Sequence, residues 1–391
     1  MPTSSMRGRA AIVGVGESDI GRLPNMSGLG LNAQAAKRAL DDAGLRVSDI
    51  DGLLTAYSLT EPYFMLATVL SEYLGLKPRY SASVMAGGAT PGIMLKHAVE
   101  AILAGHANTV LVCAGENRAT GQTRDATVAA LVAVGHPYFE QPYGSSIPGF
   151  YAMIAQRYMH EYGVTREQLA QVAVTSRAHA LLHPNAHMKK PLSMADVLAS
   201  KPIADPFNML DCCLISDAGG AFIVTSADRA RDTARKPAYI LGAGEFHTHE
   251  HLMCAPSLTE FGASHSGRAA FENAGLGPGD VDIAALYDCF TIVPLITLEE
   301  LGFCEHGAAG AFYADGEATI GGRLPVNTHG GMLSHAHAGA AGGLFGIVEA
   351  VRQLRGGLGK RQVEGAEVAL VHNEGGVMSS HSTVILGSQP A

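Results

Sequence analysis

Three histidines lie within nine residues of one another in the segment Asn327–Gly339, beside a pair of glycines at positions 330 and 331. Imidazole side chains donate hydrogen bonds or act as bases near neutral pH, and adjacent glycines let the backbone approach a ligand closely. Three histidines in so short a stretch favour a functional site over a structural one. We therefore predict that His337 is catalytic and that His335 contributes to substrate binding.

Two further polar groups directly follow apolar, strand-like runs. Tyr287-Asp288-Cys289-Phe290 comes after Ile283–Leu286, and the segment 372–376 (HNEGG) comes after Val368–Val371. Active sites of α/β proteins commonly lie at the ends of strands. Tyrosine and histidine can transfer protons there when their neighbours tune their pKa values. The predicted catalytic residues are Tyr287, Asp288 and His372, and the predicted substrate-binding residues are Cys289, Gly375 and Gly376.

The glycine-rich stretch Ala86–Gly92 spans the start of a predicted helix that opens with Thr90-Pro91. A helix start lowers the pKa of a cysteine, so a catalytic thiolate would fit there. The stretch contains no cysteine. Thr90 is its only hydroxyl and has no base visible in the sequence, so we expect Thr90 to cap a turn and not to react covalently. Gly88 and Thr90 are predicted to border the substrate.

The alternating histidines His247, His249 and His251 give a competing hypothesis. Alternate side chains on a strand share one face, and three histidines on one face could bind a metal ion. Nothing in the sequence fixes further ligands beside them, so we predict no metal site. A metal-dependent lyase or hydrolase remains an alternative. Gly14-Val15-Gly16 does not complete a GxGxxG motif, which argues against a dinucleotide site.

The elements that must position these residues occur twice. The stretch Ala36–Asp51 recurs as Gly267–Asp282, and similar helix and strand segments follow each copy in the same order. The spacing is too long for a solenoid, so the chain contains two copies of one unit. The repeat places Gly88 opposite His337, each just before a helix. Two helix starts that meet at a pseudo-twofold axis would favour an anionic group.

Strand-like and helical segments alternate along both copies. The expected strands and helices of the first copy include 10–13, 31–43, 50–56, 64–74, 90–104 and 109–113. This alternation predicts βαβ units in a layered α/β fold. We place the first half at residues 1–235 and the second at 236–391. Residues 118–203 have no counterpart in the second half and are predicted to form an inserted lid or specificity segment.

Composition excludes several classes of protein. The 391 residues include 47% hydrophobic and 16% charged residues, no tryptophan, and a net charge of −9, which argues against nucleic-acid binding. No apolar run is long enough to span a membrane, and the N-terminal segment reads as a strand and not as a signal peptide. Six cysteines without CxxC spacing are typical of reduced thiols in a cytoplasmic protein.

Taken in order, these motifs resemble the thiolase superfamily, in particular the bacterial branch near the sterol-carrier-protein thiolases, often called lipid-transfer proteins. The segments that carry the resemblance span nearly the whole chain and are 11–16, 105–116, 205–225, 287–290, 330–339 and 375–387. The resemblance implies an α/β fold of two βαβαβαββ halves in a five-layer αβαβα arrangement. It also places the family's Gly-His-Pro motif on Ala336-His337-Ala338.

The chain departs from the family at both reactive cysteines. The acylated cysteine would sit at or beside Gly88, and the second cysteine falls on His372. Without a thiolate no acyl-enzyme can form. The resemblance then implies an aldolase-like enzyme that cleaves a β-hydroxyacyl-CoA. His337 would donate to the enolate oxygen, and Tyr287 and His372 would move protons.

The resemblance also implies the ligands and partners. A coenzyme A thioester is the expected substrate, with no bound cofactor. The expected partners are a second copy of the chain and a small OB-fold/zinc-ribbon protein. The apolar strand Thr109–Cys113 is predicted to be buried at the dimer interface. The alternative function is a non-catalytic subunit that binds acyl-CoA or lipid.

Overall fold

The computed structural model describes residues 6–390 of the chain. The first half runs in the order βαβαβαββ, as the resemblance implied. Its elements are β1 (Ala10–Glu17), α1 (Gly28–Ala43), β2 (Gly52–Ala56), α2 (Leu66–Leu74), β3 (Tyr80–Val84), α3 (Thr90–Leu103), β4 (Thr109–Asn117) and β7 (Asp217–Ser226). A short helix, α8 (Ala227–Ala230), then leads into the second half. The predicted domain boundary at 235/236 lies in this connection and remains a prediction.

The second half follows the same plan with one strand missing. Its elements are β8 (Ala238–His247), α9 (Ala263–Ala274), β9 (Ile283–Leu286), α10 (Ile292–Glu300), α11 (Ala309–Ala314), α12 (Leu344–Arg355), β10 (Val368–Gly375) and β11 (Ser380–Gly387). Where β3 would recur, Val326 forms only an isolated parallel bridge with Ala284. Pro325 precedes it and has no N–H to donate, so the ladder does not extend there.

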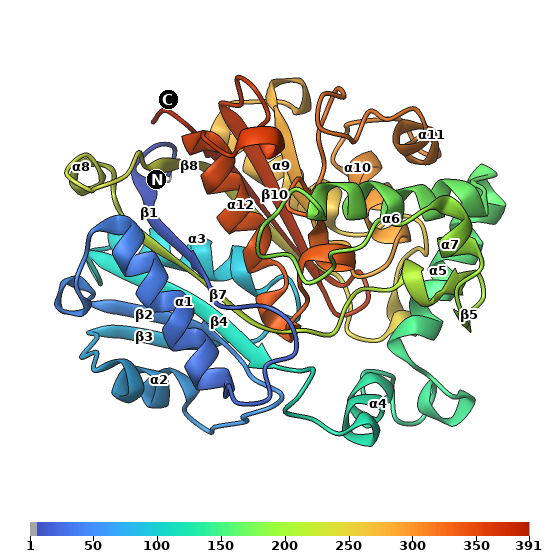
Figure 1. The fold of residues 1–391 in the computed structure, drawn as a ribbon, viewed down its shortest axis with the longest axis horizontal. Coiled ribbons are helices and arrows are strands. Elements are labelled where there is room, and N and C mark those ends of the chain that lie inside the picture. The colour runs from blue at the N-terminus through green and yellow to red at the C-terminus, as the bar shows by residue number, and fades with distance from the viewer. Residues whose placement is uncertain (1–5, 391) are drawn as a thin grey trace.

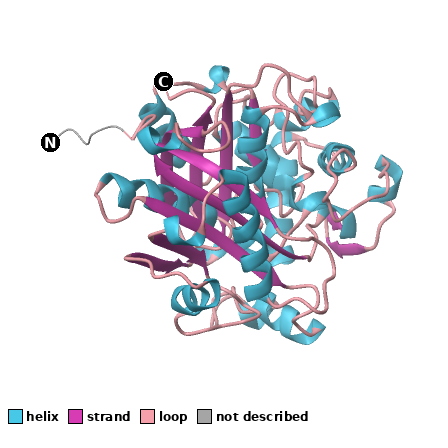
Figure 2. Cartoon of the chain, turned by 60° about the vertical axis from the view of Figure 1, so that its left-hand side comes forward, coloured by secondary structure: helices cyan, strands magenta, loops and turns pink. Residues whose placement is uncertain are grey.

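Both halves contribute to one sheet with helices on each side (Figure 2). The strand order is β3-β2-β4-β7-β1-β8-β11-β10-β9, and a short antiparallel pairing of β1 with β8 joins the halves. Helices α3 and α12 lie in the centre and contact strands of both halves, whereas α1 covers the outer face of the first half and α9 that of the second (Figure 1). The five layers that the resemblance implied are therefore α1, the strands of the first half, α3 with α12, the strands of the second half, and α9.

The two repeated aspartates serve the same purpose in each half. Asp51 accepts hydrogen bonds from the backbone N–H groups of Asn108 and Thr109, at 2.8 and 2.9 Å. Asp282 accepts two at 2.8 Å from the N–H groups at the start of β10. Each carboxylate therefore satisfies backbone donors where an inner strand begins, which explains why aspartate occupies this position in both copies.

Residues 118–203 are the segment predicted to be an insertion, and that assignment remains a prediction. The segment contains α4 (Arg124–Val132), α5 (Ile147–Tyr162), α6 (Arg166–Ala180) and α7 (Met194–Leu198), and a two-stranded sheet of β5 (Pro202–Ala204) and β6 (Phe207–Asn208) follows. Helices α5 and α6 pack against α10 and α11 of the second half (Figure 1). Helix α6 also contacts a π-helical turn, Gly331–His335, within the predicted histidine segment. Helix α6 of this segment therefore packs against the predicted histidine segment.

The prediction for the strand Thr109–Cys113 was wrong about what buries it. These residues begin β4, which pairs with β2 on one side and with β7 on the other within the same chain. Its apolar character is therefore explained by the interior of the sheet. The edge of the first half is β3, which pairs only with β2 among the described strands.

Candidate active site

Tyr287 fills the space where a nucleophile would attach. A Cβ built on Gly88 would overlap the ring carbons Cε2 and Cζ of Tyr287 and the backbone oxygen of Glu374. Tyr287 directly follows β9, and its backbone N–H donates to the oxygen of His372 in β10 at 3.0 Å. The glycine at 88 and the tyrosine at 287 are thus sterically matched. With this ring in place, the site has no room for a cysteine at position 88.

The Tyr287 hydroxyl lies 3.3 Å from Nε2 of His337. On the other side of the imidazole, Nδ1 lies 3.3 Å from the backbone oxygen of Leu214 and 3.1 Å from Sγ of Cys213. A carbonyl oxygen can only accept, so Nδ1 carries the proton. Nε2 of the neutral ring is then an acceptor, and the Tyr287 hydroxyl donates to it. The expected role of His337 as a donor to an enolate oxygen is replaced by that of an acceptor.

Burial keeps both members of this pair neutral. It raises the pKa of Tyr287 well above the usual phenol value. Burial, with a smaller contribution from the nearby Arg118, lowers the pKa of His337 to about 4. At neutral pH the pair therefore consists of a phenol and an imidazole with a free lone pair, which can pass a proton between them.

The two predicted helix starts do meet at this site, but His337 does not precede its helix directly. Helix α12 begins at Leu344, and a 3-10 turn, Gly339–Ala341, separates it from His337. The ring nevertheless folds back, since a Cβ on Gly342 would lie 2.7 Å from Cδ2 of His337. A Cβ on Gly343 would lie 2.9 Å from the Gly88 oxygen, so the starts of α3 and α12 touch.

Asp288 shapes the histidine segment instead of facing the Tyr287–His337 pair. Its Oδ1 accepts from the Met332 N–H at 2.6 Å, and Oδ2 from the Leu333 N–H at 3.5 Å. A Cβ on Gly331, where φ is +60°, would overlap the carboxyl group. Burial raises the pKa of Asp288 to about 7 although these donors oppose the shift. Asp288 therefore holds the π-helical turn that leads to His337.

A second buried acid, Glu374, contributes to the raised pKa of Tyr287. Glu374 accepts from the Tyr151 hydroxyl at 2.5 Å, from Sγ of Cys289 at 3.3 Å and from the Met378 N–H at 3.1 Å. Burial raises the pKa of Glu374 to about 7 and that of the Cys289 thiol well above its usual range. The sequence placed Glu374 in a candidate segment without assigning it a role, because its partner Tyr151 comes from the distant insertion.

His372 points away from the Tyr287–His337 pair. It is fully buried, with Nδ1 2.8 Å from Oγ1 of Thr383 and Nε2 3.3 Å from Nδ1 of His381. Successive side chains alternate across a strand. The next residue, Asn373, therefore faces the central layer, where its Oδ1 would be 2.5 Å from a Cβ on Gly343 and its Nδ2 has no hydrogen-bond partner. Asn373, and not His372, borders the meeting helix starts.

The remaining predicted contacts are structural in this geometry. Thr90 is fully buried, and its hydroxyl donates to the Gly87 oxygen at 2.7 Å and accepts from the Ala86 N–H at 3.0 Å. This is the turn-capping role that the sequence indicated. Gly375 lets the loop at 86–88 lie directly on the end of β10, because a Cβ on Gly375 would overlap the Ala86 oxygen, whereas a Cβ on Gly376 would overlap Oγ of Ser379.

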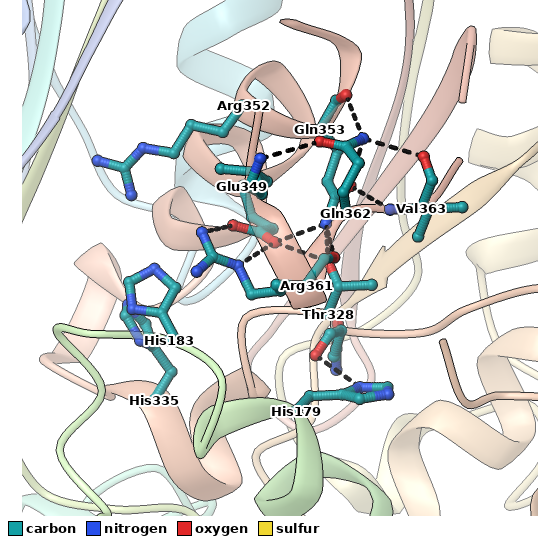
Figure 3. Close-up of polar contacts among 12 residues, drawn as sticks. His179, His183, Thr328, His335, Glu349, Arg352, Gln353, Arg361, Gln362 and Val363 are labelled. Atoms are coloured by element: carbon teal, nitrogen blue, oxygen red, sulfur yellow. Dashed lines mark hydrogen bonds and ion pairs between the residues drawn. The ribbon is translucent and has the colours of Figure 1, made fainter. Parts of the chain in front are cut away.

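His335 belongs to a separate buried cluster. Its Nε2 lies 3.2 Å from Oε1 of Glu17, whose Oε2 is 3.0 Å from Nη1 of Arg352 and 3.9 Å from Nε2 of His183. In Figure 3, His183 and His335 lie side by side below Arg352. The four residues come from the two halves and the insertion. His335 thus ties these parts together and lies outside the Tyr287–His337 pair.

Beside this cluster, Glu349 anchors the loop after α12. It pairs with Nε of Arg361 at 3.0 Å and accepts from the Thr328 hydroxyl at 2.8 Å, as Figure 3 shows. Burial opposes ionisation, but Arg361 and the nearby histidines lower the pKa of Glu349 to about 2. The charged network therefore supports the histidine segment from behind.

Neither set of histidines suits a metal ion. Only His247 belongs to β8, so His247, His249 and His251 do not share a strand face as the sequence suggested. Their Nδ1 atoms lie near different groups, at Ser380, Thr248 and Val134.

Glu17, His183 and His335 are the one group within residues 6–390 with convergent ligand atoms. However, the Asn185 N–H donates to Nδ1 of His183, so Nε2 of that neutral ring keeps its proton and cannot ligate.

Glu17→Gln is expected to destabilise the protein by about 3 kcal/mol at pH 7, since breaking a buried ion pair leaves charges unpaired. Despite its burial, the charge of Arg352 and the hydrogen bond with His335 hold the pKa of Glu17 well below its usual value of 4.5. A lowered carboxyl pKa stabilises the fold above that usual value, and the contribution is lost as the pH falls through the folded-state pKa. Denaturant unfolding at pH 7 and in acid would measure both effects.

The matched control is Asp19→Asn. Asp19 pairs with Arg38 at 2.7 Å, but 58% of its side chain is exposed. A surface pair of this kind contributes less than about 1 kcal/mol. If Glu17→Gln were as mild as Asp19→Asn, the buried cluster would not hold the halves together.

Comparison with known proteins identifies the fold family. The sequence models described as "Thiolase, N-terminal domain" and "Thiolase C-terminal domain-like" match residues 10–194 and 244–388. The chain belongs to the thiolase family. This confirms the resemblance to thiolases and the duplicated α/β fold.

Individual members of the family match almost end to end. An acetyl-CoA acetyltransferase of Methanothermobacter thermautotrophicus is 34% identical over 94% of this chain and 96% of its own. A 17-hydroxy-3-oxo-4-pregnene-20-carboxyl-CoA lyase of Mycobacterium tuberculosis is 38% identical over 96% and 98%. The solved structure of an Ltp2-ChsH2(DUF35) aldolase superposes with a TM-score of 0.87 at 35% identity, covering 98% of this chain and 99% of that chain. The relatives of this thiolase-family chain therefore include both acyltransferases and lyases.

Proposed function

We propose that this thiolase-family protein cleaves a carbon–carbon bond in a β-hydroxyacyl-CoA by a retro-aldol reaction, without an acyl-enzyme. The observation that carries the proposal is the match between Gly88 and Tyr287, in which a phenol ring fills the space of a nucleophilic side chain. The names of the M. tuberculosis lyase and of the Ltp2-ChsH2(DUF35) aldolase support this chemistry over acyl transfer.

The Tyr287–His337 pair supplies the proton transfers that the reaction needs. The Tyr287 oxygen takes the proton of the substrate β-hydroxyl while its own proton passes to Nε2 of His337. The Cα–Cβ bond then breaks, a carbonyl forms at Cβ, and the electron pair moves into the thioester enolate. Returning the proton from the pair to Cα releases the shortened acyl-CoA and an aldehyde or ketone. No oxidant and no free thiol is needed.

The enolate oxygen would be stabilised where α3 and α12 begin. Helix starts carry the positive ends of helix dipoles. Asn373 adds an amide whose Nδ2 is buried without a hydrogen-bond partner at this point. We assign the oxyanion role to this corner and the proton relay to Tyr287 and His337. His372 has no part in the proposal.

The test is a comparison of β-hydroxyacyl-CoA and β-ketoacyl-CoA thioesters, assayed with and without the candidate partner. We expect aldehyde or ketone release from the β-hydroxy compounds and no CoA-dependent cleavage of the β-keto compounds. Intact-protein mass spectrometry should show no acyl adduct. Acylated protein would contradict the non-covalent mechanism. Tight binding of both thioesters without turnover would establish a binding subunit instead.

Two partners are part of the proposal. An OB-fold/zinc-ribbon protein is supported by the similarity to the Ltp2-ChsH2(DUF35) aldolase, whose name joins two components. A second copy of the chain is supported by β3, an edge strand with unpaired backbone groups. The apolar side chains of Phe64, Met65 and Met85 are exposed near it. A cytoplasmic location is likewise proposed. None of the described helices has the length and hydrophobicity to cross a membrane.

Sedimentation at micromolar concentration should give a dimer, and Phe64→Asp should shift it towards monomer. A charge placed in an apolar interface must be desolvated without a partner, which weakens association. Tyr143→Asp serves as the control, because Tyr143 is an exposed aromatic that belongs to the segment 118–203 and not to β3 or α2. A wild-type monomer, or equal loss of dimer in both variants, would contradict an interface at β3.

A further inference from the structure

Arg118 brings a buried positive charge to the candidate site. It directly follows β4, and only 12% of its side chain is exposed. Its Nε is fully buried and has no hydrogen-bond partner. A guanidinium group has five N–H donors and stays charged at any physiological pH. A cation placed so far from water without complete pairing costs free energy unless an anion joins it.

Glu116, the nearest carboxylate, does not complete this pairing. Its Oε2 is 4.0 Å from Nη1 of Arg118, beyond hydrogen-bond distance. Its Oε1 is already occupied by the Ser58 hydroxyl and by the backbone N–H groups of Leu59 and Thr60. Burial raises the pKa of Glu116 although Arg118 opposes the shift, so the pairing is too weak to restore ordinary ionisation. Arg118 therefore keeps N–H donors that have no hydrogen-bond partner, Nε among them.

Arg118 lies beside the loop that follows His337. A Cβ on Gly339, two residues after His337, would be 3.4 Å from Nη1 of Arg118. The same Cβ would overlap Oε2 of Glu116, so a glycine at 339, where φ is +58°, lets the carboxylate and the guanidinium group both approach the loop after His337. The positive charge of Arg118 also acts to lower the pKa values of His337 and Cys213. The guanidinium group thus faces the same corner as the Tyr287–His337 pair.

We propose that Arg118 binds a carboxylate on the acyl group, so that the enzyme prefers CoA thioesters of dicarboxylic acids over thioesters of neutral chains. The proposal rests on the proposed function only for the location of the acyl group. A guanidinium group and a carboxylate match in geometry and form paired, charge-assisted hydrogen bonds. A neutral acyl chain would leave the buried donors unpaired, which adds to the preference.

Binding of unreactive thioesters tests this without relying on turnover. Succinyl-CoA and butyryl-CoA have the same chain length and differ in one carboxylate, and neither carries a β-hydroxyl. By calorimetry, the wild-type protein should bind succinyl-CoA about 10- to 100-fold more tightly, the range expected for hydrogen bonds to a charged group. Arg118→Leu should bring the ratio of the two Kd values close to one, and Arg118→Lys should give an intermediate ratio.

The control variant is Arg231→Leu, because Arg231 is an exposed arginine whose side chain is 69% accessible. It should keep the wild-type ratio. Equal Kd values for the two thioesters in the wild-type protein would overturn the proposal even if Arg118→Leu failed to fold. An equal loss of affinity for both ligands and for free CoA would overturn it too, since Arg118 would then contact the coenzyme.

Kinetics separates this proposal from the proposed function. If Arg118 acted on the enolate oxygen, Arg118→Leu would lower kcat for neutral and carboxylated β-hydroxyacyl-CoA substrates alike, which would overturn the carboxylate assignment. If no thioester were cleaved but the succinyl preference depended on Arg118, the carboxylate site would stand and the retro-aldol function would fail.

Discussion

Tyr287→Phe is expected to lower kcat for cleavage of a β-hydroxyacyl-CoA by about 10²- to 10⁴-fold, with little change in KM. The substitution removes one oxygen and keeps the ring that fills the space above Gly88, so packing and substrate access should be preserved. What is lost is the only hydroxyl in hydrogen-bond contact with Nε2 of His337 among the described residues. Because the β-hydroxyl proton must leave as the Cα–Cβ bond breaks, its loss acts on the chemical step.

Single-turnover kinetics would measure this step directly. The matched control is Tyr158→Phe, which removes another buried tyrosine hydroxyl, one that donates to Glu299 and not to a residue of the pair. This variant should lose stability but keep its rate of cleavage. Wild-type turnover in Tyr287→Phe would exclude the relay, and the base for the β-hydroxyl would have to be another group.

The repeat in the sequence was enough to predict two copies of one α/β unit, and the resemblance to thiolases implied how their layers are arranged. Asp51 and Asp282 fall in register because each caps the start of an inner strand, and Gly44 and Gly275 end equivalent helices in left-handed conformation. These requirements are local, so the sequence shows them directly at the positions concerned. The loss of a strand at Val326 is harder to predict, because only one residue, Pro325, prevents the ladder from extending.

The site was harder to predict, because its partners are distant in sequence. The pairing of Tyr287 with Gly88 depends on the packing of two halves, and that of Glu374 with Tyr151 depends on the insertion. The assignment of His372 failed for a simpler reason. A strand of known position still leaves open which of two neighbours faces the centre, and here Asn373 does. Nothing in the sequence marked Arg118, whose significance lies in donors that lack a partner.

His337→Ala is expected to lower kcat by about 10²- to 10³-fold, because the Tyr287 proton then has no acceptor. The pH dependence distinguishes this role from simple packing. The pKa of His337 is lowered to about 4, so the imidazole stays free to accept a proton throughout the neutral range. Wild-type kcat should be level near neutrality and fall as the pH drops towards about 4. A donor role would require the opposite trend, with activity rising as His337 becomes protonated.

A double variant gives the sharpest test of the relay. If Tyr287 and His337 act as one unit, removing the second group should cost little once the first is gone, as for other catalytic groups that share a step. Tyr287→Phe combined with His337→Ala should therefore be about as slow as the slower single variant. Multiplied losses would show that the two residues act in separate steps. Nδ1 of His337 is held by the Leu214 oxygen and Nε2 faces the phenol, so the imidazole has no free nitrogen for an independent contact. The geometry therefore predicts non-additivity.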